Sequence, residues 1–455
     1  MLIEILALPN VVLMSSAECR FKVKYKTRIE GSRKTVKLKH KYTPSSSAIV
    51  FELLNKAKVH NGLALFRLSD TLFMLTWSNG KPPISILELN TLKSQCTNRP
   101  FQGGYVGWLG FEAGFHFEGV ETKRQLPNEP LDLFWECDGA IHIDTKHQKL
   151  TVYGQMNFKE EAAKIISSKS VSTTELEKTA KSISSPNQSK DHFLTAVEQV
   201  QSDIREGHVY QVNVSWSLEH HIPNPTLVFE KLFLSNPARY TSFLQYDNHG
   251  VISNSPELFL SVKPAEDGAQ ITSIPIKGTA NQTDLKSRKN LWESPKERAE
   301  LSMIVDMVRN DLSRVAQVGT VKVHHRRIRR CGDLLHAEQK VSAKLKEGCG
   351  IPELFAATFP PASVTGAPKV SAIKRIHRLE KNSRGIYTGC IGYVGHDGQA
   401  QFSVAIRCLP FTDQTARLHI GSGIVFDSSP PLEWLETLAK ARAIRNILTP
   451  TSQIK

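Results

Sequence analysis

Lys277 is the residue of this sequence whose type and setting most directly suggest chemistry. It is the one charged residue in the run Pro-Ile-Lys-Gly-Thr at 275–279. A lysine amine can act as a nucleophile when burial or a neighbouring positive charge keeps it uncharged. A lysine on a strand is more often a solvated edge residue, and the run alone does not separate these alternatives. The acidic and anion-binding residues that follow it in the chain favour the chemical one.

Two pairs of glutamates have the spacing of one helical face. Glu297 and Glu300 lie in a segment with helical periodicity, and Glu433 and Glu436 lie in the last predicted helix, with Lys440 one turn further on. Residues three apart on a helix share a face. Mg²⁺ prefers a few carboxylates together with water and substrate oxygens, so these glutamates are candidate ligands. Two amphipathic helices with solvated acidic faces are the alternative.

The Gly-Ser-Gly sequence at 421–423 is a candidate anion site. It is predicted to form a turn between strands at 416–420 and 424–426. Gly421 and Gly423 would let backbone N–H groups approach an anion closely. A bulge within a strand explains the same two glycines equally well.

Three further polar residues extend this candidate anion site. Arg407 ends an apolar strand predicted from Phe402 and needs an anionic partner unless its side chain reaches solvent. Tyr387, in a Gly-rich turn, is either a hydroxyl donor or an ordinary core residue. Ser363 comes just before Thr365, the predicted N-cap of a helix whose free N–H groups would point outward. A well-capped helix without a ligand is the alternative there.

The elements that must position these residues predict an α+β fold. Residues 1–156 are an N-terminal β-rich region, and residues 157–190, rich in Lys, Ser, Thr and Glu, are a connector. Strands and helices then alternate irregularly through 191–455, beginning with a helix whose apolar residues recur with helical spacing. We expect antiparallel sheets with helices packed outside them.

The net charge of +14 raises the question of nucleic-acid binding. Much of the excess lies in residues 20–41, which hold ten Lys and Arg and are predicted to include a basic strand, and in residues 324–330. No helix-turn-helix, zinc-finger or aromatic RNA-binding motif accompanies either cluster. A solvated face or an acidic protein partner is therefore favoured, and we expect no nucleic acid as partner.

Bulk properties predict a cytoplasmic protein. Its 455 residues correspond to about three domain-sized units. The seven cysteines form no CxxC pair, so neither a disulfide framework nor a zinc site is indicated. No stretch approaches the roughly 20 apolar residues of a membrane span, so we expect no association with a membrane. Phosphate-loop, dinucleotide and H-E-x-x-H motifs are also missing from the sequence.

Taken in order, these motifs resemble the chorismate-utilising enzymes, and most closely the aminodeoxychorismate synthase large subunits among them. The resemblance is dense from 193 to 446 and thinner upstream. It implies large antiparallel β-sheets forming a sandwich, with helices packed outside. The stretches that carry it are 210–213, 255–257, 275–279, 297–300, 309–311, 363–369, 384–387, 405–407, 421–423 and 436–440.

The resemblance implies a dicarboxylate substrate, chorismate, and Mg²⁺ as cofactor. The cation would bridge the ring carboxylate of chorismate to the protein. Glu300 and Glu436 would be its ligands, with Glu297 and Glu433 assisting directly or through water.

The resemblance also implies how the two substrate carboxylates would be held. Gly421 and Gly423, with Lys440 nearby, would meet the ring carboxylate. Arg407 and Tyr387 would hold the enolpyruvyl carboxylate.

A general acid is implied as well. Glu257 would protonate the departing C4 hydroxyl, with His336 close to it and Ser363 also at the substrate. Such an acid must be protonated near neutral pH, so we expect partial burial to raise its pKa.

Two positions distinguish the members of the family that the sequence resembles. Members that add water at C2 carry a lysine base at the position of Gln211, and a neutral amide cannot take a proton from water. Anthranilate synthases place a small residue where this chain has Lys277. In aminodeoxychorismate synthases that lysine attacks C2 covalently. Ala280 and the stretch Phe-Pro-Pro-Ala-Ser at 359–363 depart from the usual pattern, which leaves rate and loop geometry open.

The sequence thus predicts an enzyme that converts chorismate and ammonia to 4-amino-4-deoxychorismate, a precursor of p-aminobenzoate and folate. No cysteine has the context of a glutaminase nucleophile, so we expect free ammonia or a separate glutaminase subunit as the source of nitrogen. The alternatives are the large subunit of anthranilate synthase and, outside the class, a non-catalytic basic binding protein.

Overall fold

The structure is a computed structural model of the chain. It describes residues 36–37, 47–89, 100–121, 129–168, 181–182, 187–235, 237–266, 268–281, 285–331 and 334–448. Most of the basic segment 20–41, including its predicted strand, lies outside these residues, as does much of the connector between 168 and 187.

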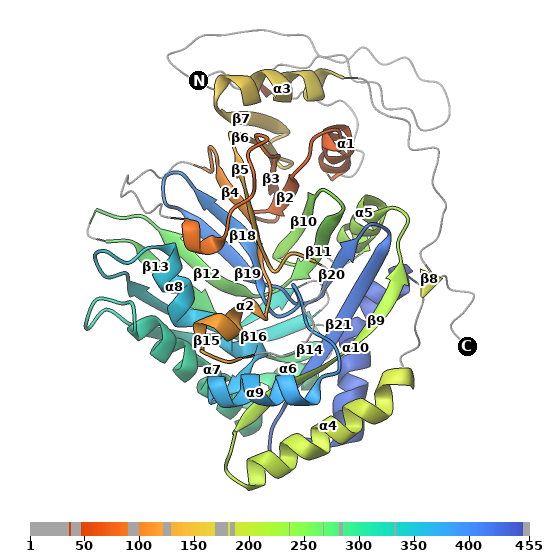
Figure 1. Cartoon of the computed structure of the whole chain (residues 1–455), viewed down its shortest axis with the longest axis vertical. Helices are drawn as coiled ribbons and strands as arrows, with labels where there is room; N and C mark the ends of the chain where they lie inside the picture. Colours follow the sequence, from red (N-terminus) through yellow and green to blue (C-terminus); the bar gives the residue numbers. More distant parts are fainter. Residues whose placement is uncertain are drawn as a thin grey trace.

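Two large antiparallel sheets form the centre of the molecule (Figure 1). In the described residues the first sheet has twelve strands. Its order is β1 (Val36–Lys37), β7 (Lys149–Gly154), β6 (Gly139–Asp144), β3 (Leu72–Thr76), β2 (Leu63–Arg67), β10 (Tyr240–Tyr246), β11 (His249–Ser255), β20 (Cys408–Thr412), β21 (Thr415–Ile424), β9 (Gln211–His221) and β17 (Gly366–Ala367), and β8 (Lys181–Ser182) also pairs with β9.

The second sheet has nine strands in the same part of the chain. Its order is β14 (Ile276–Asn281), β16 (Leu334–Lys344), β13 (Gln270–Ile274), β12 (Leu258–Lys263), β19 (Ala400–Val404), β18 (Cys390–Gly395), β4 (Gly104–Leu109) and β5 (Asp132–Cys137), and β15 (Lys322–Cys331) pairs with β16.

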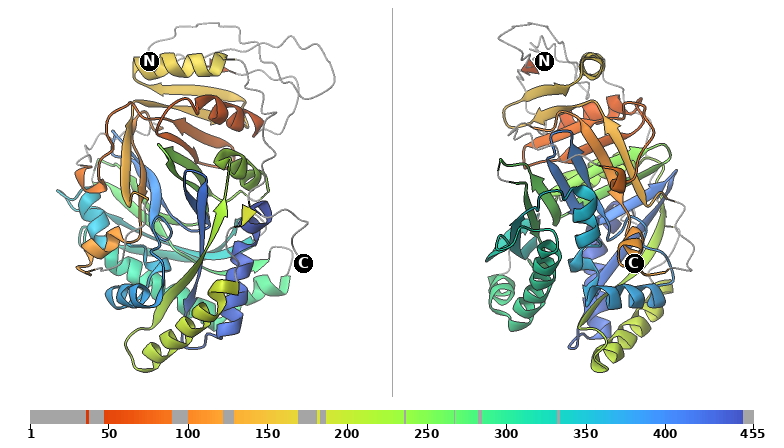
Figure 2. Two further views of the ribbon diagram at one scale, coloured as in Figure 1. Left: turned by 45° about the vertical axis from the view of Figure 1, so that its right-hand side comes forward. Right: turned by 60° about the vertical axis from the view of Figure 1, so that its left-hand side comes forward.

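Helices cover the outer face of each sheet (Figure 2). The first sheet is covered by α1 (Ala48–Ala57), α3 (Met156–Ser167), α4 (Asn187–Arg205), α5 (Pro225–Ser235), α9 (Lys369–Leu379) and α10 (Pro430–Leu448). The second is covered by α6 (Leu285–Glu293), α7 (Pro295–Ser313), α8 (Ile351–Thr358) and the short helices η1 (Ile86–Glu88) and η2 (Ala362–Val364). The short helix α2 (Ala113–Phe117) contacts α9, where the rings of Phe115 and His377 meet edge to face at 5.6 Å.

A third core lies between the two sheets, which makes the molecule a layered α-β-β-α sandwich. Trp108 of β4 and Trp135 of β5 are fully buried there and meet edge to face at 5.8 Å, with Leu244 and Val251 contributed by the other sheet. Because helices cover one face of each sheet and the other sheet covers the opposite face, strands are apolar on both faces. The predicted α+β sandwich with helices outside is confirmed.

The regions expected from the sequence do not form separate sheets. β2 of the N-terminal region pairs with β10, and β4 pairs with β18, so strands from before residue 156 are built into both sheets. Length suggested about three domain-sized units, but the three cores share the same two sheets.

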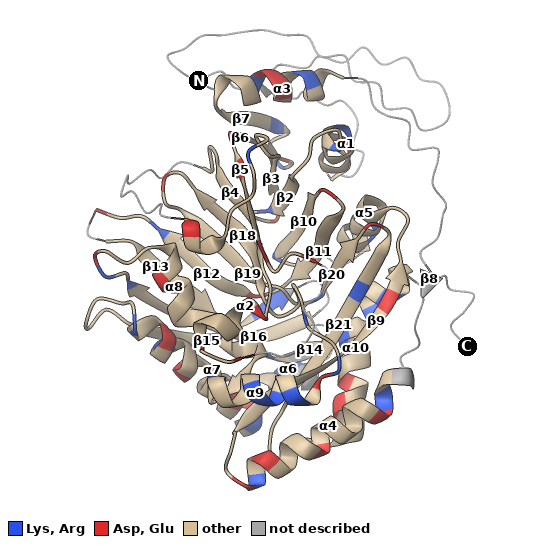
Figure 3. Cartoon of the chain, in the orientation of Figure 1, with Lys and Arg blue, Asp and Glu red and all other residues tan. Residues whose placement is uncertain are grey.

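Charged residues of both signs lie on outer helices such as α4 and α10, whereas the strands between the helices carry few (Figure 3). The second basic cluster, 324–330, lies on β15, whose one partner strand in the described residues is β16. Within the same residues no helix is long and apolar enough to span a membrane. Cys137, Cys349, Cys390 and Cys408 are unpaired.

Trp108→Ala tests the core between the sheets. We expect it to lower the free energy of unfolding by about 3–5 kcal/mol, because it leaves a large cavity between two layers. Val318→Ala, at a side chain that is 99% exposed, is the control and should stay within about 0.5 kcal/mol of the wild type. Urea denaturation measures both. A loss below 1 kcal/mol for Trp108→Ala would contradict this assignment of the core.

Candidate active site

The predicted site residues meet where β14 of the second sheet approaches β21 of the first. A Cβ atom placed on Gly423 would lie only 3.1 Å from Nζ of Lys277 and closer still to the Gln211 amide. The Lys277 amine therefore lies directly against Gly423, although the two residues belong to different sheets. A side chain at this position would displace the Gln211 amide and crowd the Lys277 amine.

Gly421 and Gly423 lie inside a continuous strand, which corrects the predicted turn. β21 runs from Thr415 to Ile424 and pairs with β9 along its whole length. A Cβ at Gly421 would lie 2.7 Å from Oδ1 of Asn213 and 2.8 Å from the Tyr387 hydroxyl. The local pattern could not show these cross-strand neighbours, which are the reason for the glycines.

The same strand has a free edge at this place. β20 pairs with β21 only at Thr415 and Ala416 in the described residues, so from 417 to 424 the edge away from β9 has no neighbouring strand there. The Lys440 amine donates to the Gly421 carbonyl at 3.2 Å. The unpaired backbone edge at the two glycines, with the Lys440 cation beside it, is therefore a suitable surface for binding a carboxylate.

A local irregularity of β14 directs Lys277 into the site. The register with β16 shifts between Lys277 and Ala280, and Gly278 has a φ of +69°. Burial lowers the pKa of the Lys277 amine, and Lys440 lowers it further, whereas Glu300 and Glu257 act in the opposite direction. The dominant effect of burial is to increase the fraction of uncharged amine, as a nucleophile requires.

Glu257 is buried in the connection between β11 and β12. Burial raises the pKa of its carboxyl to about 7, although the Ser363 hydroxyl, Lys277, the Ile276 backbone N–H and Arg407 all favour the charged form. Desolvation dominates, because a carboxylate without water is costly. A large share of Glu257 is therefore protonated at neutral pH, as expected for a general acid.

His336 is buried between Arg407 and the strand that carries Lys277. Its Nδ1 lies 3.0 Å from the Gly278 carbonyl and its Nε2 lies 3.2 Å from an Arg407 nitrogen. Burial and the Arg407 charge lower the pKa of His336 to about 3. The ring is therefore neutral, donating through Nδ1 and accepting through Nε2, and it orients Arg407 rather than supplying a proton at neutral pH.

Arg407 is not in a strand, which corrects the sequence prediction. It lies in the connection between β19 of the second sheet and β20 of the first, with a φ of +51°. The Asn254 N–H donates to its carbonyl at 3.0 Å. A positive φ is uncommon outside glycine. Here it accompanies the crossing of the chain between sheets, and it places a partly buried guanidinium beside His336 and Glu257.

Tyr387 lies in a turn, as predicted, with its hydroxyl next to Gly421. Its ring stacks on His419 of β21 at 5.2 Å with an interplanar angle of 16°. Burial raises the pKa of the phenol, so the hydroxyl remains a donor over the working pH range.

Ser363 lies in η2 and its hydroxyl acts on Glu257 rather than on a helix terminus. The helix that follows begins at Lys369, with Pro368 in the cap position. Thr365 is not the N-cap, because its hydroxyl donates to the Pro361 carbonyl at 2.8 Å. Proline-rich backbone and tertiary burial override the local capping pattern here.

Two of the candidate metal ligands, Glu300 and Glu436, lie on facing elements of the site. Burial raises the pKa of Glu300 and Lys277 opposes this rise, whereas the charges of Glu297 and, to a smaller extent, Glu436 add to it. Burial also acts to raise the pKa of Glu436, but Lys440, whose amine lies 2.7 Å from its carboxylate, outweighs burial and lowers it. α7 packs on one sheet and α10 on the other (Figure 2), so a cation held by both carboxylates would bridge the sheets. Two carboxylates from facing elements, one of which raises the pKa of the other, fit a divalent cation.

Glu297 and Glu433 do not join them in a compact group. Glu297 packs against Gly278. Glu433 is buried, and its carboxylate accepts hydrogen bonds from Ser422 and Ser428. The structure therefore uses Glu433 to hold the Gly-Ser-Gly strand.

Elsewhere, one group of three potential ligands lies within 4.8 Å in the described residues. It consists of Asp203, Glu206 and His208. Asp203 is already paired with Arg375 and Arg378, at 3.3 and 2.7 Å. This group is therefore a structural ion-pair cluster and not the predicted metal site.

Two amides on β9 lie in the site; sequence reasoning used Gln211 only to distinguish members of the resembled family and gave Asn213 no role. Oε1 of Gln211 and Oδ1 of Asn213 are buried acceptors without a partner among the described groups, and both amides lie next to the β21 glycines. Buried polar atoms are normally paired, so these oxygens are available to a bound ligand. Their spacing of two residues on a strand, which puts both on one face, is the signal that could have found them.

Comparison with known proteins identifies the family of the chain. Residues 68–446 match the family described as chorismate binding enzyme. The chain is 31% identical over 391 residues to anthranilate synthase component 1 of Lactococcus lactis, covering 80% of this chain and 84% of that protein. It is also 31% identical over 368 residues to aminodeoxychorismate synthase component 1 of Bacillus subtilis, covering 76% and 77%.

Solved structures agree on the fold. Anthranilate synthase component I from Streptococcus pneumoniae superimposes with a TM-score of 0.69 at 23% identity, covering 92% of this chain and 95% of that one. The chain belongs to the family of chorismate-binding enzymes. Anthranilate synthase is the more frequent name among the relatives.

Glu257→Gln tests the burial of the candidate acid without any assay of activity. A carboxyl whose pKa is about 7 in the fold and lower when unfolded binds more protons in the folded state. The wild type should therefore lose stability as the pH rises from 5 to 8, by up to about 3 kcal/mol from this group. The Gln variant should lack that loss, so its stability relative to wild type should increase over this range. Urea unfolding at several pH values measures it.

Glu293→Gln, at an exposed carboxylate on α6, is the control. It should follow the wild type at every pH. If the free energies of unfolding of Glu257→Gln and wild type differed by the same amount at every pH from 5 to 8, Glu257 would titrate normally.

Proposed function

We propose that this enzyme converts chorismate and ammonia to 4-amino-4-deoxychorismate, with Lys277 as a covalent nucleophile. The observation that supports the proposal is the position of the Lys277 amine, buried against Gly423 and surrounded by Glu300, Glu257, Glu436 and Lys440. An amine at this place lies inside the site and not at a solvated edge.

The two carboxylates of chorismate would lie on two separate cationic surfaces. The ring carboxylate would contact the backbone of Gly421 and Gly423 beside Lys440. Arg407, oriented by His336, and the Tyr387 hydroxyl would hold the enolpyruvyl carboxylate. Two fixed anion positions determine which ring carbon faces Lys277.

Mg²⁺ would be held by Glu300 and Glu436, with Glu297 and Glu433 assisting through water or by orienting their neighbours. The cation would neutralise the ring carboxylate and the two glutamates together. Its binding would also remove the repulsion from Glu297 and Glu436, which adds to the effect of burial on the pKa of Glu300.

The proposed reaction has two displacement steps. In the first, the uncharged Lys277 amine bonds to C2, the two ring double bonds each move by one position around the ring, and the C4–O bond breaks as Glu257 donates its proton, so the hydroxyl leaves as water. In the second, ammonia bonds to C4, the two double bonds move back, and the C2–N bond to Lys277 breaks. The new ammonium group loses a proton, which restores the acid, and one ammonia has replaced one water.

A separate amidotransferase subunit, or free ammonia, would supply the nitrogen. The names of the relatives, which are component 1 of anthranilate and aminodeoxychorismate synthases, support a multi-component arrangement.

Anthranilate synthase is the second candidate, and the frequency of that name among the relatives favours it. In that reaction ammonia would enter at C2, and the aromatic product would form after loss of pyruvate. In the substrate orientation proposed above, the Lys277 amine would face C2, which argues against direct entry of ammonia there.

Incubation with chorismate, Mg²⁺ and ammonium identifies the product. We expect 4-amino-4-deoxychorismate, detected by mass and by conversion to p-aminobenzoate with an added lyase. Lys277→Ala should lower its rate of formation by at least about 100-fold, because direct attack of ammonia at C4 lacks the covalent step. Lys289→Ala, at an exposed lysine on α6, is the control.

Fluorescent anthranilate formed by the wild type without lyase would establish the second candidate. Unchanged formation of 4-amino-4-deoxychorismate by Lys277→Ala would rule out the covalent role while leaving the reaction in place.

Glu436→Gln tests the proposed metal site. We expect it to weaken Mg²⁺ binding in the presence of chorismate by about 10-fold or more, a loss of at least about 1.4 kcal/mol, because one of the two bridging charges is removed. Calorimetric titration with Mg²⁺ measures this directly. Glu347→Gln, at an exposed residue, should bind as wild type does. Equal affinities for all three proteins would place the cation elsewhere.

A further inference from the structure

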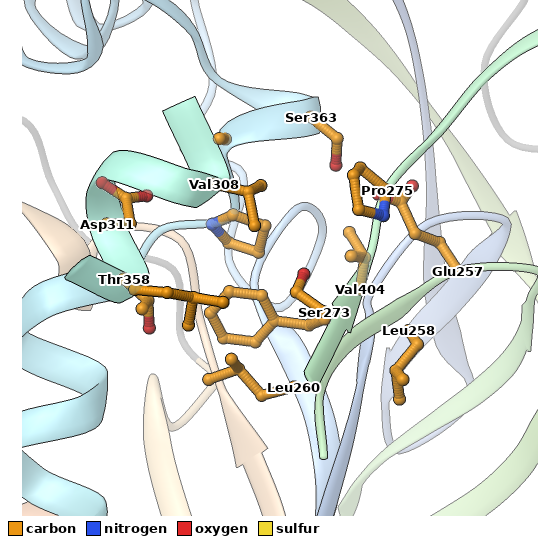
Figure 4. A pocket seen from close by; sticks show the side chains of 14 residues that line it. Glu257, Leu258, Leu260, Ser273, Pro275, Val308, Asp311, Thr358, Ser363 and Val404 are labelled. Atoms are coloured by element: carbon orange, nitrogen blue, oxygen red, sulfur yellow. The ribbon is translucent and has the colours of Figure 1, made fainter. Parts of the chain in front are cut away.

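A small cavity lies behind Glu257, between the second sheet and α7 (Figure 4). It has about 20 Å³ of space open to the centre of a water molecule. Most of its wall is apolar. Its polar lining consists of Glu257, Ser273, Asp311, Thr358 and Ser363.

Two hydroxyl groups point into this space. In Figure 4 the Ser363 hydroxyl points toward it from η2, and the Ser273 hydroxyl points toward it from β13. The Ser363 oxygen is buried and has no hydrogen-bond partner of good geometry among the described groups. Ser363 nevertheless influences the Glu257 carboxyl from this position.

The other polar groups of the lining are already occupied. The Thr358 hydroxyl donates to the Leu354 carbonyl at 2.7 Å, and Asp311 accepts from the Lys369 amine at 2.7 Å. Ser363, Ser273 and Glu257 therefore form the end of the cavity where a small polar molecule would bind.

A buried water needs about 10–15 Å³ of such space and two to four polar partners. The cavity as a whole has enough volume, and its polar groups at the Glu257 end supply the partners. A dry cavity would leave the buried Ser363 hydroxyl with no partner besides its contact with Glu257, which is unfavourable for a buried polar group.

We propose that this cavity is a binding site for one ordered water molecule, held by the Ser363 and Ser273 hydroxyls and hydrogen-bonded to the Glu257 carboxyl. The water makes Ser363 a positioning residue for the acid, which differs from the substrate contact expected from the sequence. The water site is compatible with both candidate reactions, amination of chorismate at C4 and at C2, because Glu257 has the same role in each.

The water has a function in each turnover. When Glu257 gives up its proton, a carboxylate is left in a buried site whose other charged neighbours are Lys277 on β14 and Arg407 on the crossing segment. Tyr240, whose pKa is raised to about 12 chiefly by burial, also interacts with it. A water on the side away from the substrate donates to that carboxylate and stabilises it, so removal of the water favours the protonated form.

Crystallography of Ser273→Val tests the site. The substitution removes one hydroxyl and adds a methyl group inside the cavity. In the wild type, crystallised without ammonium, we expect a density peak within hydrogen-bonding distance of the Ser363 oxygen, and in the variant we expect none. Thr358→Val is the matched control, because it alters the same lining without changing its volume and should keep the peak. A wild-type map that shows other buried waters but none here would overturn the proposal.

The titration of Glu257 provides a second readout. Ser273→Val should raise its pKa by about half a unit or more, through loss of the donor to the carboxylate. Ser273→Ala, which keeps the space, and Thr358→Val should shift it less. The midpoint is measured from the pH dependence of stability relative to Glu257→Gln and, where the enzyme turns over chorismate, from the alkaline limb of kcat/KM.

The proposed function bears only on the kinetic part of this test. Loss of the density peak with an unchanged Glu257 midpoint would overturn the link between water and acid. If the density peak and the Glu257 midpoint from unfolding both behave as expected but chorismate is not turned over, the proposed function is refuted and the water site stands.

Discussion

The buried guanidinium of Arg384 is the constraint on which the geometry of the site depends. It is 1% exposed and bonds both oxygens of Glu380, at 2.6 and 2.9 Å. Its remaining N–H groups donate to the carbonyls of Asn213 and Val364, at 2.7 and 3.1 Å, and to the Thr388 hydroxyl at 3.1 Å. A buried charge is tolerated only when it is paired and its donors are used. The positions of β9, η2 and the Tyr387 turn are thereby fixed together.

A second buried carboxylate extends this network to the N-terminal region. Glu112 accepts the backbone N–H groups of Arg384 and Gly385, at 2.6 and 2.9 Å. The carboxylate that pairs with the guanidinium also accepts from the Ser215 backbone at 2.7 Å. One ion pair thus connects a strand of the first sheet with the turn that leads into the second. Tyr387 lies three residues after Arg384 in the same turn, so this network also determines the direction of its hydroxyl. Removing either partner of such a pair typically costs about 3–5 kcal/mol.

The sequence predicts those parts of the site that depend on local periodicity. Glu297 and Glu300 occur on a helix as expected, because a spacing of three and an apolar face are properties of the helix itself. The glycines at 421 and 423 are misread as a turn, because what excludes a side chain there is Asn213, Tyr387 and Gln211 from other elements. Arg407 is misread as a strand residue, because the crossing between sheets is determined by tertiary packing. The family resemblance identified all of these residues, but only the assembled sheets explain their conformations.

Lys277 and Glu257 show how one environment can prepare a base and an acid together. In water, an amine and a carboxylic acid in proximity exchange a proton and form an ion pair. Burial disfavours both charged forms, so it lowers the pKa of Lys277 and raises that of Glu257. Their mutual attraction opposes both shifts, but desolvation is the larger effect for each group. Lys440 adds to the shift of the lysine, whereas Glu300 resists it. A cation that neutralised Glu300 would remove that resistance and leave the amine less basic. In the proposed reaction, metal binding, substrate binding and activation of the nucleophile would therefore be coupled through the charges around a single amine.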